Sequence, residues 1–526
     1  MQWKSYLRAT NPVAMLALLA CFVSLIIALN YVLTRRRSRV PGPRGLPLVG
    51  NTLQLTRPTW LLFDEWKQQY GPIISVSIAG REFIVLNTSK VAYELLTKRA
   101  TKYSDRPRLI VAGELLTNGM HVAFARYGDL WRRLRKGAHR CLSKEVSQTF
   151  GSFQSLEAVL IAESLLRDPG SWDNHFQRAT ASLIMGITYN LPPLKSEKDP
   201  SIARIHAHIT RVVNALYPGH LVEIFHWMEH LPSWLTPWKT EAAYWGQKDT
   251  EIFTELYKET LEKNSSNPSV VAALEAQKDQ INLSPVERVW LAGGLYGAGT
   301  ETSYAALQWF IVALVHYPEV QEKAYRELMA VVGPSRPPSF ADYDNLPYVR
   351  AVLKEVLRVW PPTPLGIPHY VTEDDWYEGY FIPKGTTCLA NIWSINRDQE
   401  VHGPDADQFR PERYLDADGK VATPHPETHE EGHSTFGYGR RICVGRYVAN
   451  SSLFIDFATI LWACHVRPYV DDTGQVNLPD KDMSSNSGVT LHPVPFKITI
   501  EARSPQVPTL LSQTKEFYLH ANELSG

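Results

Sequence analysis

The pattern that most restricts the fold is a long apolar stretch in the second half of the chain. Ser284 is a good helix N-cap, Pro285 suits the first helical position, and Glu287 stands where a capping box needs an acid. Apolar residues then dominate up to Val315, and Tyr317 followed by proline ends the helix. A helix of about 32 residues spans roughly 48 Å. Because most of its faces are apolar, we expect it to cross the middle of the domain.

The interior of this stretch contains residues that a buried helix does not favour. Glycines in a helix cost about 1 kcal/mol each relative to alanine, and they stand here at Gly293, Gly294, Gly297 and Gly299. Close packing against a neighbouring helix could account for these glycines. It does not account for Glu301 and Thr302, because a buried acid beside a hydroxyl needs hydrogen-bond partners or a task in proton transfer. We therefore favour a functional role for this pair.

Composition excludes two classes of protein. The 526 residues are 44% hydrophobic, which is too high a fraction for a disordered chain. The 54 basic residues are balanced by 54 acidic ones, so the chain lacks the positive field of a general nucleic-acid binder.

The remaining patterns predict the fold class. Alternating residues at 74–86 predict a β-hairpin, and most of the sequence from there to residue 360 is typical of helices. Strand-like pieces return around 381–395 and near the C-terminus, while residues 416–433 are polar and typical of a loop. No interdomain linker or internal repeat is found. We expect one mainly α domain with small β-sheets (α+β) over residues 51–502.

Residues 13–33 carry no charge and predict a membrane anchor within residues 1–33. As a helix they would span roughly 31 Å, about the hydrocarbon thickness of a bilayer. A cleaved signal peptide is the alternative, but its apolar core is usually only about 7–15 residues long. Arginines follow the segment and outnumber the basic residues before it, which places the rest of the chain in the cytosol. Residues 34–50, which are basic and proline-rich, would form a hinge. Residues 503–526 have no apparent role.

The cysteines point to one unusual site. The chain has five cysteines and no Cys-x-x-Cys pair, which argues against a disulfide framework and a zinc ribbon. Cys443 differs from the others because glycines and arginines surround it. Glycine lets backbone approach a large flat ligand, and Arg441 can neutralise a carboxylate. Helical spacing after Cys443 places it at or just before a helix N-terminus, which stabilises a thiolate. A single thiolate under apolar and aromatic cover is the axial haem ligand of oxygen-activating enzymes.

Two other roles for Cys443 must be weighed. A catalytic nucleophile would need a general base, and His433 is the nearest histidine in sequence. A buried structural cysteine is the ordinary case. Neither role explains the glycines, Arg441, or the acid and hydroxyl at Glu301 and Thr302.

A further helix is expected at residues 346–360, where two prolines end it. Glu355 and Arg358 are three residues apart on this helix and share one face. An exposed ion pair would contribute little to stability. The apolar residues around the pair predict at least partial burial, and therefore a structural role.

Three ordered patterns resemble the cytochrome P-450 family of haem-thiolate monooxygenases, most of all its fungal microsomal members. They are Phe-x-x-Gly-x-Arg-x-Cys-x-Gly at 436–445, Glu-x-x-Arg at 355–358 and Ala-Gly-x-Glu-Thr at 298–302. The resemblance runs from the N-terminal apolar segment to roughly residue 500. It implies the cytochrome P-450 fold with one N-terminal transmembrane helix, and haem b (iron protoporphyrin IX) held by an axial cysteine thiolate.

The resemblance also implies roles for individual residues. Cys443 would be the axial ligand of the haem iron, and Phe436, Gly437 and Gly445 would line the same loop against the haem. Arg413 would join the structural pair of Glu355 and Arg358. The partners of the haem propionates would be Trp131, Arg135, His369 and Arg441.

Electron and proton supply follow from the same resemblance. Glu301 and Thr302 would relay protons during O₂ activation. Electrons would come from NADPH–cytochrome P-450 reductase or cytochrome b5. The docking surface would be the basic helix face near Trp131, which consists of Arg132, Arg133, Lys136 and Arg140. A charged face that is simply solvated is the common alternative.

The substrate is expected to be a lipophilic small molecule, in keeping with secondary-metabolite biosynthesis and the endoplasmic reticulum membrane. Aromatic residues typical of a membrane interface gather in one proline-broken region; they are Tyr217, Phe225, Trp227, Trp234 and Trp238. Candidate pocket positions, by resemblance, are residues 109–124, Tyr296, Leu365, Ile367 and residues 487–489. A haem-thiolate isomerase or dehydratase and a non-catalytic haem sensor are the alternatives. Neither would need the relay at Glu301 and Thr302.

Overall fold

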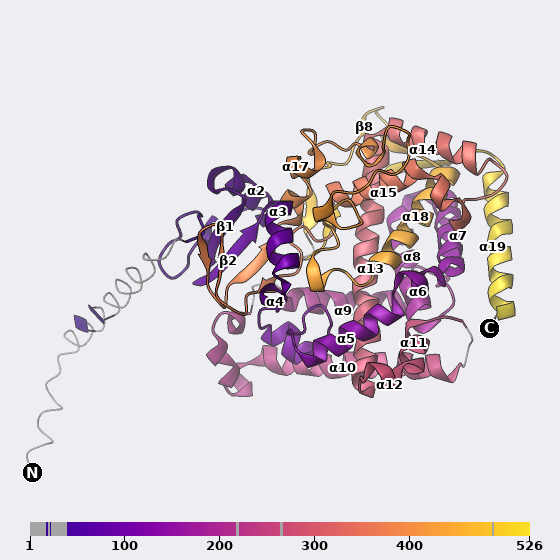
Figure 1. Ribbon diagram of the computed structural model, residues 1–526. Coiled ribbons are helices and arrows are strands. Elements are labelled where there is room, and N and C mark those ends of the chain that lie inside the picture. Colours follow the sequence, from indigo (N-terminus) through magenta and orange to yellow (C-terminus); the bar gives the residue numbers. More distant parts are fainter. Residues whose placement is uncertain are drawn as a thin grey trace, which may run out of the picture.

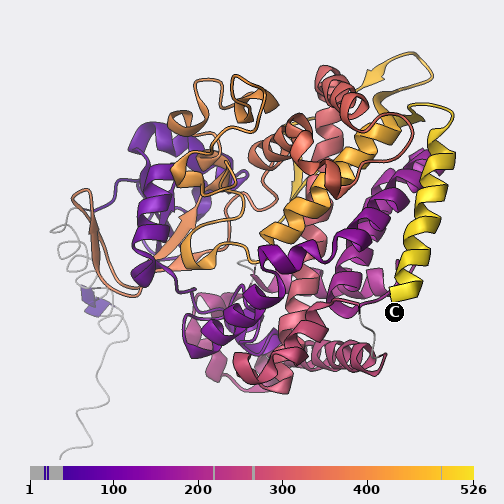
Figure 2. The same cartoon turned by 45° about the vertical axis from the view of Figure 1, so that its right-hand side comes forward.

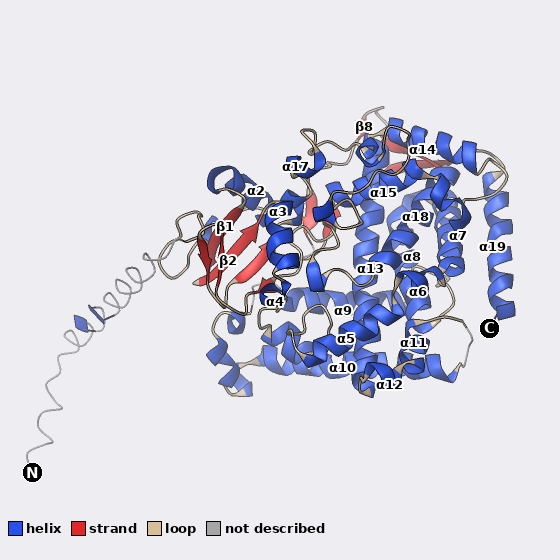
Figure 3. Ribbon diagram, in the orientation of Figure 1, coloured by secondary structure: helices blue, strands red, loops and turns tan. Residues whose placement is uncertain are grey.

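The computed structural model describes residues 39–216, 220–263, 267–486 and 489–525, together with residues 17, 18, 21 and 22. Helices make up most of this part of the chain, and the largest sheet lies at one end (Figures 1 and 3). This mainly helical architecture with small sheets agrees with the predicted fold class.

The helices and strands follow one another along the described chain. The α-helices are α2 (Thr59–Tyr70), α3 (Ser89–Ala92), α4 (Ala100–Tyr103), α5 (Asp129–Cys141), α6 (Lys144–Gln148), α7 (Gly151–Arg167), α8 (Trp172–Tyr189), α9 (Pro200–Leu216), α10 (Pro237–Glu262), α11 (Val270–Ala276), α12 (Lys278–Ile281), α13 (Pro285–His316), α14 (Pro318–Val331), α15 (Pro347–Val359), α16 (Ile392–Ile395), α17 (Gln399–His402), α18 (Arg446–Ala463) and α19 (Val507–Ser525). The strands are β1 (Ile73–Ile78), β2 (Arg81–Leu86), β3 (His369–Tyr370), β4 (Asp375–Tyr377), β5 (Tyr380–Ile382), β6 (Thr387–Ala390), β7 (Cys464–Val470), β8 (Val476–Asn477), β9 (Ser484–Asn486), β10 (Leu491–Pro493) and β11 (Ile498–Ala502). Short π-helices are η3 (Tyr93–Lys98) and η4 (Ile110–Leu116), and short 3₁₀-helices include η6 (Leu221–Glu223), η7 (His226–His230), η8 (Ser233–Leu235) and η12 (Gly439–Arg441).

Helix α13 runs through the middle of the domain, as predicted (Figure 1). Its capping box is present: the Glu287 N–H donates to Ser284 Oγ at 3.4 Å, and the Ser284 N–H donates to Glu287 Oε2 at 2.7 Å. From Leu291 to Val315 most of its side chains are buried. Local capping chemistry and the long apolar pattern therefore specify the element on which the rest of the domain packs.

Two glycines of α13 allow close contact with neighbouring helices. A Cβ atom on Gly293 would lie 2.4 Å from the Phe253 ring of α10, and one on Gly299 would lie 2.7 Å from Ile184 of α8. These two glycines therefore serve close helix packing, the explanation that the sequence analysis considered for them.

Helices α15 and α18 complete the core on another side of α13. Phe310 of α13 stacks on Phe457 of α18 with ring centroids 3.7 Å apart, and Trp309 stacks on Trp360 at 5.4 Å. The first contact fixes the C-terminal half of α13 against α18, the helix that follows Cys443, and the second fixes it against the end of α15.

Strands β1 and β2 form the predicted antiparallel hairpin. It extends into a four-stranded sheet of order β1-β2-β6-β3, in which β2 and β6 are parallel. The strand prediction around 381–395 is right for β5 and β6 but wrong for residues 392–395, which form α16. There Asn391 caps the helix, accepting the Ser394 N–H at 3.5 Å.

The predicted anchor at residues 13–33 lies outside the described residues, apart from residues 17, 18, 21 and 22. In the part of the chain that is described, no helix combines the length and apolarity that crossing a membrane requires.

The C-terminal tail forms α19, which lies beside α7 at the outer edge of the domain (Figure 2, yellow). Val507 and Leu511 are buried in the main core, and Lys515 forms an ion pair with Glu163 of α7 at 2.7 Å. No pattern in residues 503–526 indicated this packing role.

Candidate active site

The loop before α18 brings Phe436 and Cys443 together. Gly437 and Gly439 have φ values of 76° and 56°, in the left-handed region that favours glycine. A Cβ atom on Gly439 would lie 2.1 Å from the Leu96 carbonyl oxygen, so this position has no space for a side chain. The loop is closed by the Cys443 N–H, which donates to the Phe436 carbonyl oxygen at 2.8 Å.

The Cys443 side chain is exposed, whereas Cys141, Cys388 and Cys464 are buried. Burial still raises the pKa of the Cys443 thiol, while the Gly445 N–H and the nearby arginines Arg135 and Arg446 lower it. The sulfur is thus accessible, and yet enough protein surrounds it to raise the pKa of its thiol, as expected at a position that binds a ligand inside the domain. This combination distinguishes Cys443 from Cys464, whose pKa burial raises to about 12.

One face of α13 is accessible in the middle of the domain. Ala298 is exposed, and Leu295 and Thr302 are partly exposed, although most of their helical neighbours are buried. Their spacing of three and four residues puts them on one face. Tyr296, a predicted pocket position, instead donates through its hydroxyl to the Ser201 carbonyl oxygen of α9 at 3.2 Å.

Three arginines near this loop have no carboxylate partner. Arg441 donates only to backbone carbonyl oxygens, at 2.8 Å and longer, and burial lowers its pKa to about 9. Arg106 also donates only to carbonyl oxygens, and burial holds its pKa well below the usual range. Arg135 has no hydrogen-bond or ion-pair partner among the described residues, and burial lowers its pKa too. The sequence analysis did not identify Arg106 as a member of this site.

Trp131 and His369, the two residues with ring side chains predicted at this site, differ in their contacts with the arginines. The Arg441 guanidinium lies 4.1 Å from the centroid of the Trp131 ring, so the two side chains form a cation–π contact. Burial, Arg106 and Arg441 keep the pKa of His369 well below its usual value. Its Nδ1 donates to the Tyr103 carbonyl oxygen at 2.7 Å, which leaves Nε2 as an acceptor in the neutral ring. A nearby anion would favour the protonated ring, which donates from both nitrogens.

These features fit haem b. The accessible Cys443 sulfur can bind iron, the accessible face of α13 provides a wall for a flat ring, and the unpaired guanidinium groups provide partners for two propionates. Without anions beside them, desolvated cations such as Arg106 and Arg441 would be costly.

Glu355, Arg358 and Arg413 form a buried ionic cluster. Arg358 donates to both oxygens of Glu355 at 2.7 Å, and both side chains are completely buried. Arg413 donates to Glu355 Oε1 at 3.0 Å. Burial lowers the pKa of Arg358, but the Glu355 carboxylate outweighs it and the net shift is upward. The remaining Arg358 donors bind the carbonyl oxygens of Asn396, Ala406 and Gln408. The cluster thus ties α15 to the loops that lead toward Cys443.

Glu301 and Thr302 have different partners. The Thr302 hydroxyl donates to the Ala298 carbonyl oxygen at 2.9 Å, one turn earlier, which leaves its lone pairs free to accept. Glu301 Oε1 lies 2.9 Å from His492 Nε2, whereas Glu301 Oε2 is buried with no hydrogen-bond partner among the described residues. Sequence reasoning missed His492, because it lies on a short strand almost two hundred positions away.

The basic face of α5 is partly occupied by structural contacts. Arg133 binds Asp129 and Glu287, and so supports the capping box of α13. Lys136 and Arg140 donate to acceptors on Gln280, while Arg132 is exposed beside the Tyr127 ring. Arg132 and Lys136 therefore present the most accessible charge of the face.

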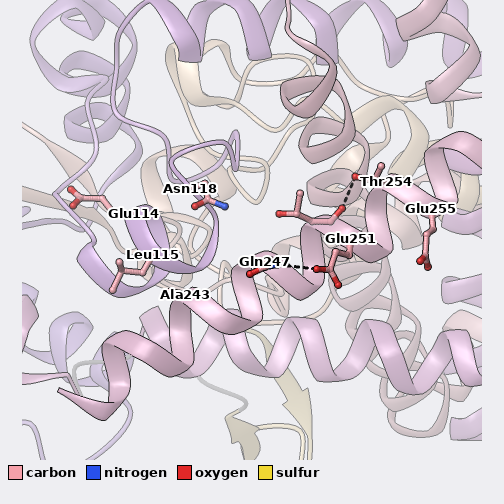
Figure 4. A pocket seen from close by; sticks show the side chains of 9 residues that line it. Glu114, Leu115, Asn118, Ala243, Gln247, Glu251, Thr254 and Glu255 are labelled. Atoms are coloured by element: carbon pink, nitrogen blue, oxygen red, sulfur yellow. Dashed lines mark hydrogen bonds between the residues drawn. The ribbon is translucent and has the colours of Figure 1, made fainter. Parts of the chain in front are cut away.

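A surface pocket of about 610 Å³ lies between η4 and α10, away from these residues (Figure 4). Its acidic side chains include Glu114, which pairs with Arg108, and Glu251, which pairs with Lys248. Glu114, Leu115 and Asn118 of the predicted pocket range 109–124 line it, but none of the residues predicted for haem binding, proton relay or reductase docking does.

Comparisons with known proteins agree with this site. A sequence model described as Cytochrome P450 matches residues 40–500. A cytochrome P450 monooxygenase of Armillaria gallica is 46% identical over 504 residues, which cover 95% of this chain and 96% of the relative. Cytochrome P450 monooxygenase 58 of Postia placenta is 43% identical over 509 residues, covering 96% of each chain. A cytochrome P450 monooxygenase of Amanita muscaria is 36% identical over 547 residues, covering 94% of this chain and 96% of the relative.

Proposed function

Because the chain belongs to the cytochrome P450 family of haem-thiolate monooxygenases, we propose that Cys443 holds the haem and that the enzyme oxidises a lipophilic small molecule. When bound, haem b with a cysteine thiolate supplies O₂ activation, in which one oxygen atom enters the substrate and the other leaves as water. The observation that carries the assignment is the accessible Cys443 sulfur, three residues before α18 and close to Arg135 and Arg446.

Arg135, Arg441 and Arg106 would bind the haem propionates, with Trp131 and His369 beside them. Their support is electrostatic, because these guanidinium groups have no carboxylate partner in the protein. Phe436 would cover the sulfur side, and the loop glycines Gly437 and Gly445 would let backbone approach the ring.

Thr302 would help to deliver protons at the O₂ site. Its hydroxyl hydrogen is used by the Ala298 carbonyl oxygen, so its lone pairs point elsewhere and can accept a hydrogen bond from a water that carries the proton. Thr302→Ala is therefore expected to raise the share of NADPH electrons released as hydrogen peroxide by about tenfold, below the roughly 10²–10⁴-fold of a complete acid–base contribution. Peroxide and NADPH are measured together in reductase-supported holoenzyme. Thr302→Ser, which keeps the hydroxyl, is the matched control, and unchanged peroxide release from Thr302→Ala would remove this residue from proton handling.

The redox partner would be NADPH–cytochrome P-450 reductase, with cytochrome b5 as a second donor, docking on Arg132 and Lys136. Reversing both charges, Arg132→Glu with Lys136→Glu, is expected to slow haem reduction by about tenfold at low salt, because steering by opposite charge would be lost. Stopped-flow reduction with the reductase measures this rate, and haem content should stay constant. Lys384→Glu with Lys497→Glu, on other exposed surfaces, is the control. Equal rates in both double variants would reject the docking surface.

Exposed apolar side chains support a membrane-bound enzyme in the endoplasmic reticulum, its active domain facing the cytosol. Trp227 and Trp234 are 62% and 78% exposed in the segment between α9 and α10, and Leu48, close to the predicted anchor, is 82% exposed. Arg81 connects these regions: it follows the β1 strand that pairs with Gly50, and it contacts the Ile224 carbonyl oxygen and His226. Such apolar surface is suited to lipid contact and to uptake of a lipophilic substrate, as expected in secondary-metabolite biosynthesis. Screening lipophilic compounds for a shift in iron spin state tests the substrate class.

A further inference from the structure

His492 of β10 links the predicted proton-handling acid to a second group of polar side chains. It is 8% exposed. Its Nε2 lies 2.9 Å from Glu301 Oε1, and its Nδ1 lies 2.7 Å from Gln308 Oε1. Both ring nitrogens therefore have a side-chain partner on α13, and the partners decide where the ring protons can be.

The orientation of the Gln308 amide is fixed by Asp173 of α8. Gln308 Nε2 donates to Asp173 Oδ1 at 2.7 Å, and the Tyr304 hydroxyl donates to the same carboxylate at 2.8 Å. Burial and the nearby Asp173 raise the pKa of Tyr304, so the phenol keeps its proton and remains a donor. An ionised carboxylate only accepts, so the Gln308 NH₂ group must face Asp173 and the amide oxygen must face His492.

This orientation determines the protonation of the neighbouring pair. Because the Gln308 oxygen only accepts, His492 Nδ1 must carry a hydrogen. The contact between His492 Nε2 and Glu301 Oε1 then needs one proton, on the imidazole or on the carboxyl group. With no proton, two lone pairs would face each other at 2.9 Å. We propose that Glu301 and His492 act as one unit that holds a single transferable proton, with Gln308 and Asp173 fixing its position.

The unit would supply protons to the oxygen chemistry, and this step rests on the proposed function. Glu301 Oε2 is buried and has no protein partner among the described residues, so that side of the carboxyl group is free. When Glu301 carries the shared proton on Oε1, rotation of the carboxyl group would bring that hydrogen to the free side, where it can pass to a water or toward Thr302. Giving up that proton leaves a neutral ring facing a carboxylate. One proton from solvent then restores the hydrogen bond between the two groups. His492 would thus return a proton to Glu301 between turnovers.

The first experiment measures how holoenzyme with reductase partitions O₂ in the absence of substrate. Reduction to hydrogen peroxide consumes one NADPH per O₂, and reduction to water consumes two, so the NADPH-to-O₂ ratio reports proton delivery. His492→Phe, which removes both ring nitrogens, is expected to raise the peroxide-to-water ratio by about tenfold, below the roughly 10²–10⁴-fold of a complete acid–base contribution because Glu301 is still present. His492→Gln, which can donate to Glu301 but carries no transferable proton, should raise the ratio equally. Recovery of the wild-type ratio in His492→Gln would reduce His492 to a positioning role and overturn the proposal.

Asp173→Asn tests the orientation directly, because it changes neither member of the pair. Without the carboxylate, the Gln308 amide can turn and donate to His492 Nδ1, which moves the imidazole hydrogen to Nε2 and leaves Glu301 without a proton to give. The same rise in peroxide is expected. His316→Gln is the control, since His316 also lies on α13 but hydrogen-bonds the Pro479 carbonyl oxygen. A wild-type ratio in both Asp173→Asn and His492→Phe would refute the proposal.

Thermal unfolding of holoenzyme provides a readout that does not depend on turnover. Glu301→Gln, His492→Gln and the double variant form a double-mutant cycle. If the two side chains share one proton, the double variant should be no less stable than the less stable of the two single variants. Additive losses would contradict the pair. The reduced carbon monoxide spectrum and the rate of haem reduction test the proposed function separately: their loss in wild-type protein would reject the monooxygenase assignment, whereas normal values with an unchanged O₂ partition would reject the pair alone.

Discussion

Cys443→Ala is expected to yield protein without the strongly red-shifted absorption that a reduced, thiolate-bound haem gives with carbon monoxide. Cys443 is the cysteine of residues 39–525 whose side chain is exposed, and it lies beside the N-terminus of α18. Removing its sulfur removes the electron donor that favours O–O cleavage. Monooxygenase activity should fall to background. Haem content and the carbon monoxide spectrum of membranes or purified protein measure the outcome.

Cys464→Ala is the matched control for this prediction. Cys464 begins β7 directly after α18, is buried in the main core, and has its pKa raised by burial. Its loss should leave the spectrum unchanged and cost only a small packing energy. A normal spectrum in Cys443→Ala, or its loss in Cys464→Ala alone, would move the iron ligand away from the loop before α18.

Glu355→Gln is expected to destabilise the domain by about 3–5 kcal/mol, the usual cost of leaving a buried charge without its partner. Arg358 is completely buried and would lose the negative charge of its partner, and the glutamine NH₂ group would face an arginine donor where a carboxylate oxygen had accepted. Since this cluster holds α15 against the chain leading to Cys443, haem incorporation should fall together with stability. Denaturant unfolding and the haem-to-protein ratio measure the two effects.

The control for this substitution is the exposed ion pair between Arg467 and Glu501 on the β7–β11 sheet. Glu501→Gln should change the free energy of unfolding by less than about 1 kcal/mol, since solvent screens such pairs. Equal losses in the two variants would mean that burial of the Glu355 cluster does not determine its contribution.

Part of this fold could be predicted from the sequence because capping residues and alternating side chains act over a few positions. The boundaries of α13 follow from Ser284, Glu287 and Pro318, and the β1–β2 hairpin follows from strict alternation, because these signals act within a few residues. The strand expected at 392–395 is wrong because Asn391 starts a short helix there, a local effect that apolar content hides.

The residues of the candidate site could be predicted only where they belong to motifs of the family. Arg106 and His492 were missed because neither has a local signal: Arg106 acquires its role from distant carbonyl oxygens, and His492 from Glu301 on another element. A polar pattern on α13 offered a hint, since Glu301, Tyr304 and Gln308 are spaced by three and four residues along one face. Which partner they meet depends on tertiary packing, which no spacing within α13 reveals.

The position of α19 has a consequence for biogenesis. Val507 and Leu511 close the main core beside α7, yet the ribosome makes them long after α7 itself. Until α19 has been synthesised, the apolar side of α7 that it covers stays exposed. The domain therefore cannot reach its final packed state before α19 has left the ribosome, and a chain cut off before Val507 would keep an open core, a natural substrate for chaperones and proteases.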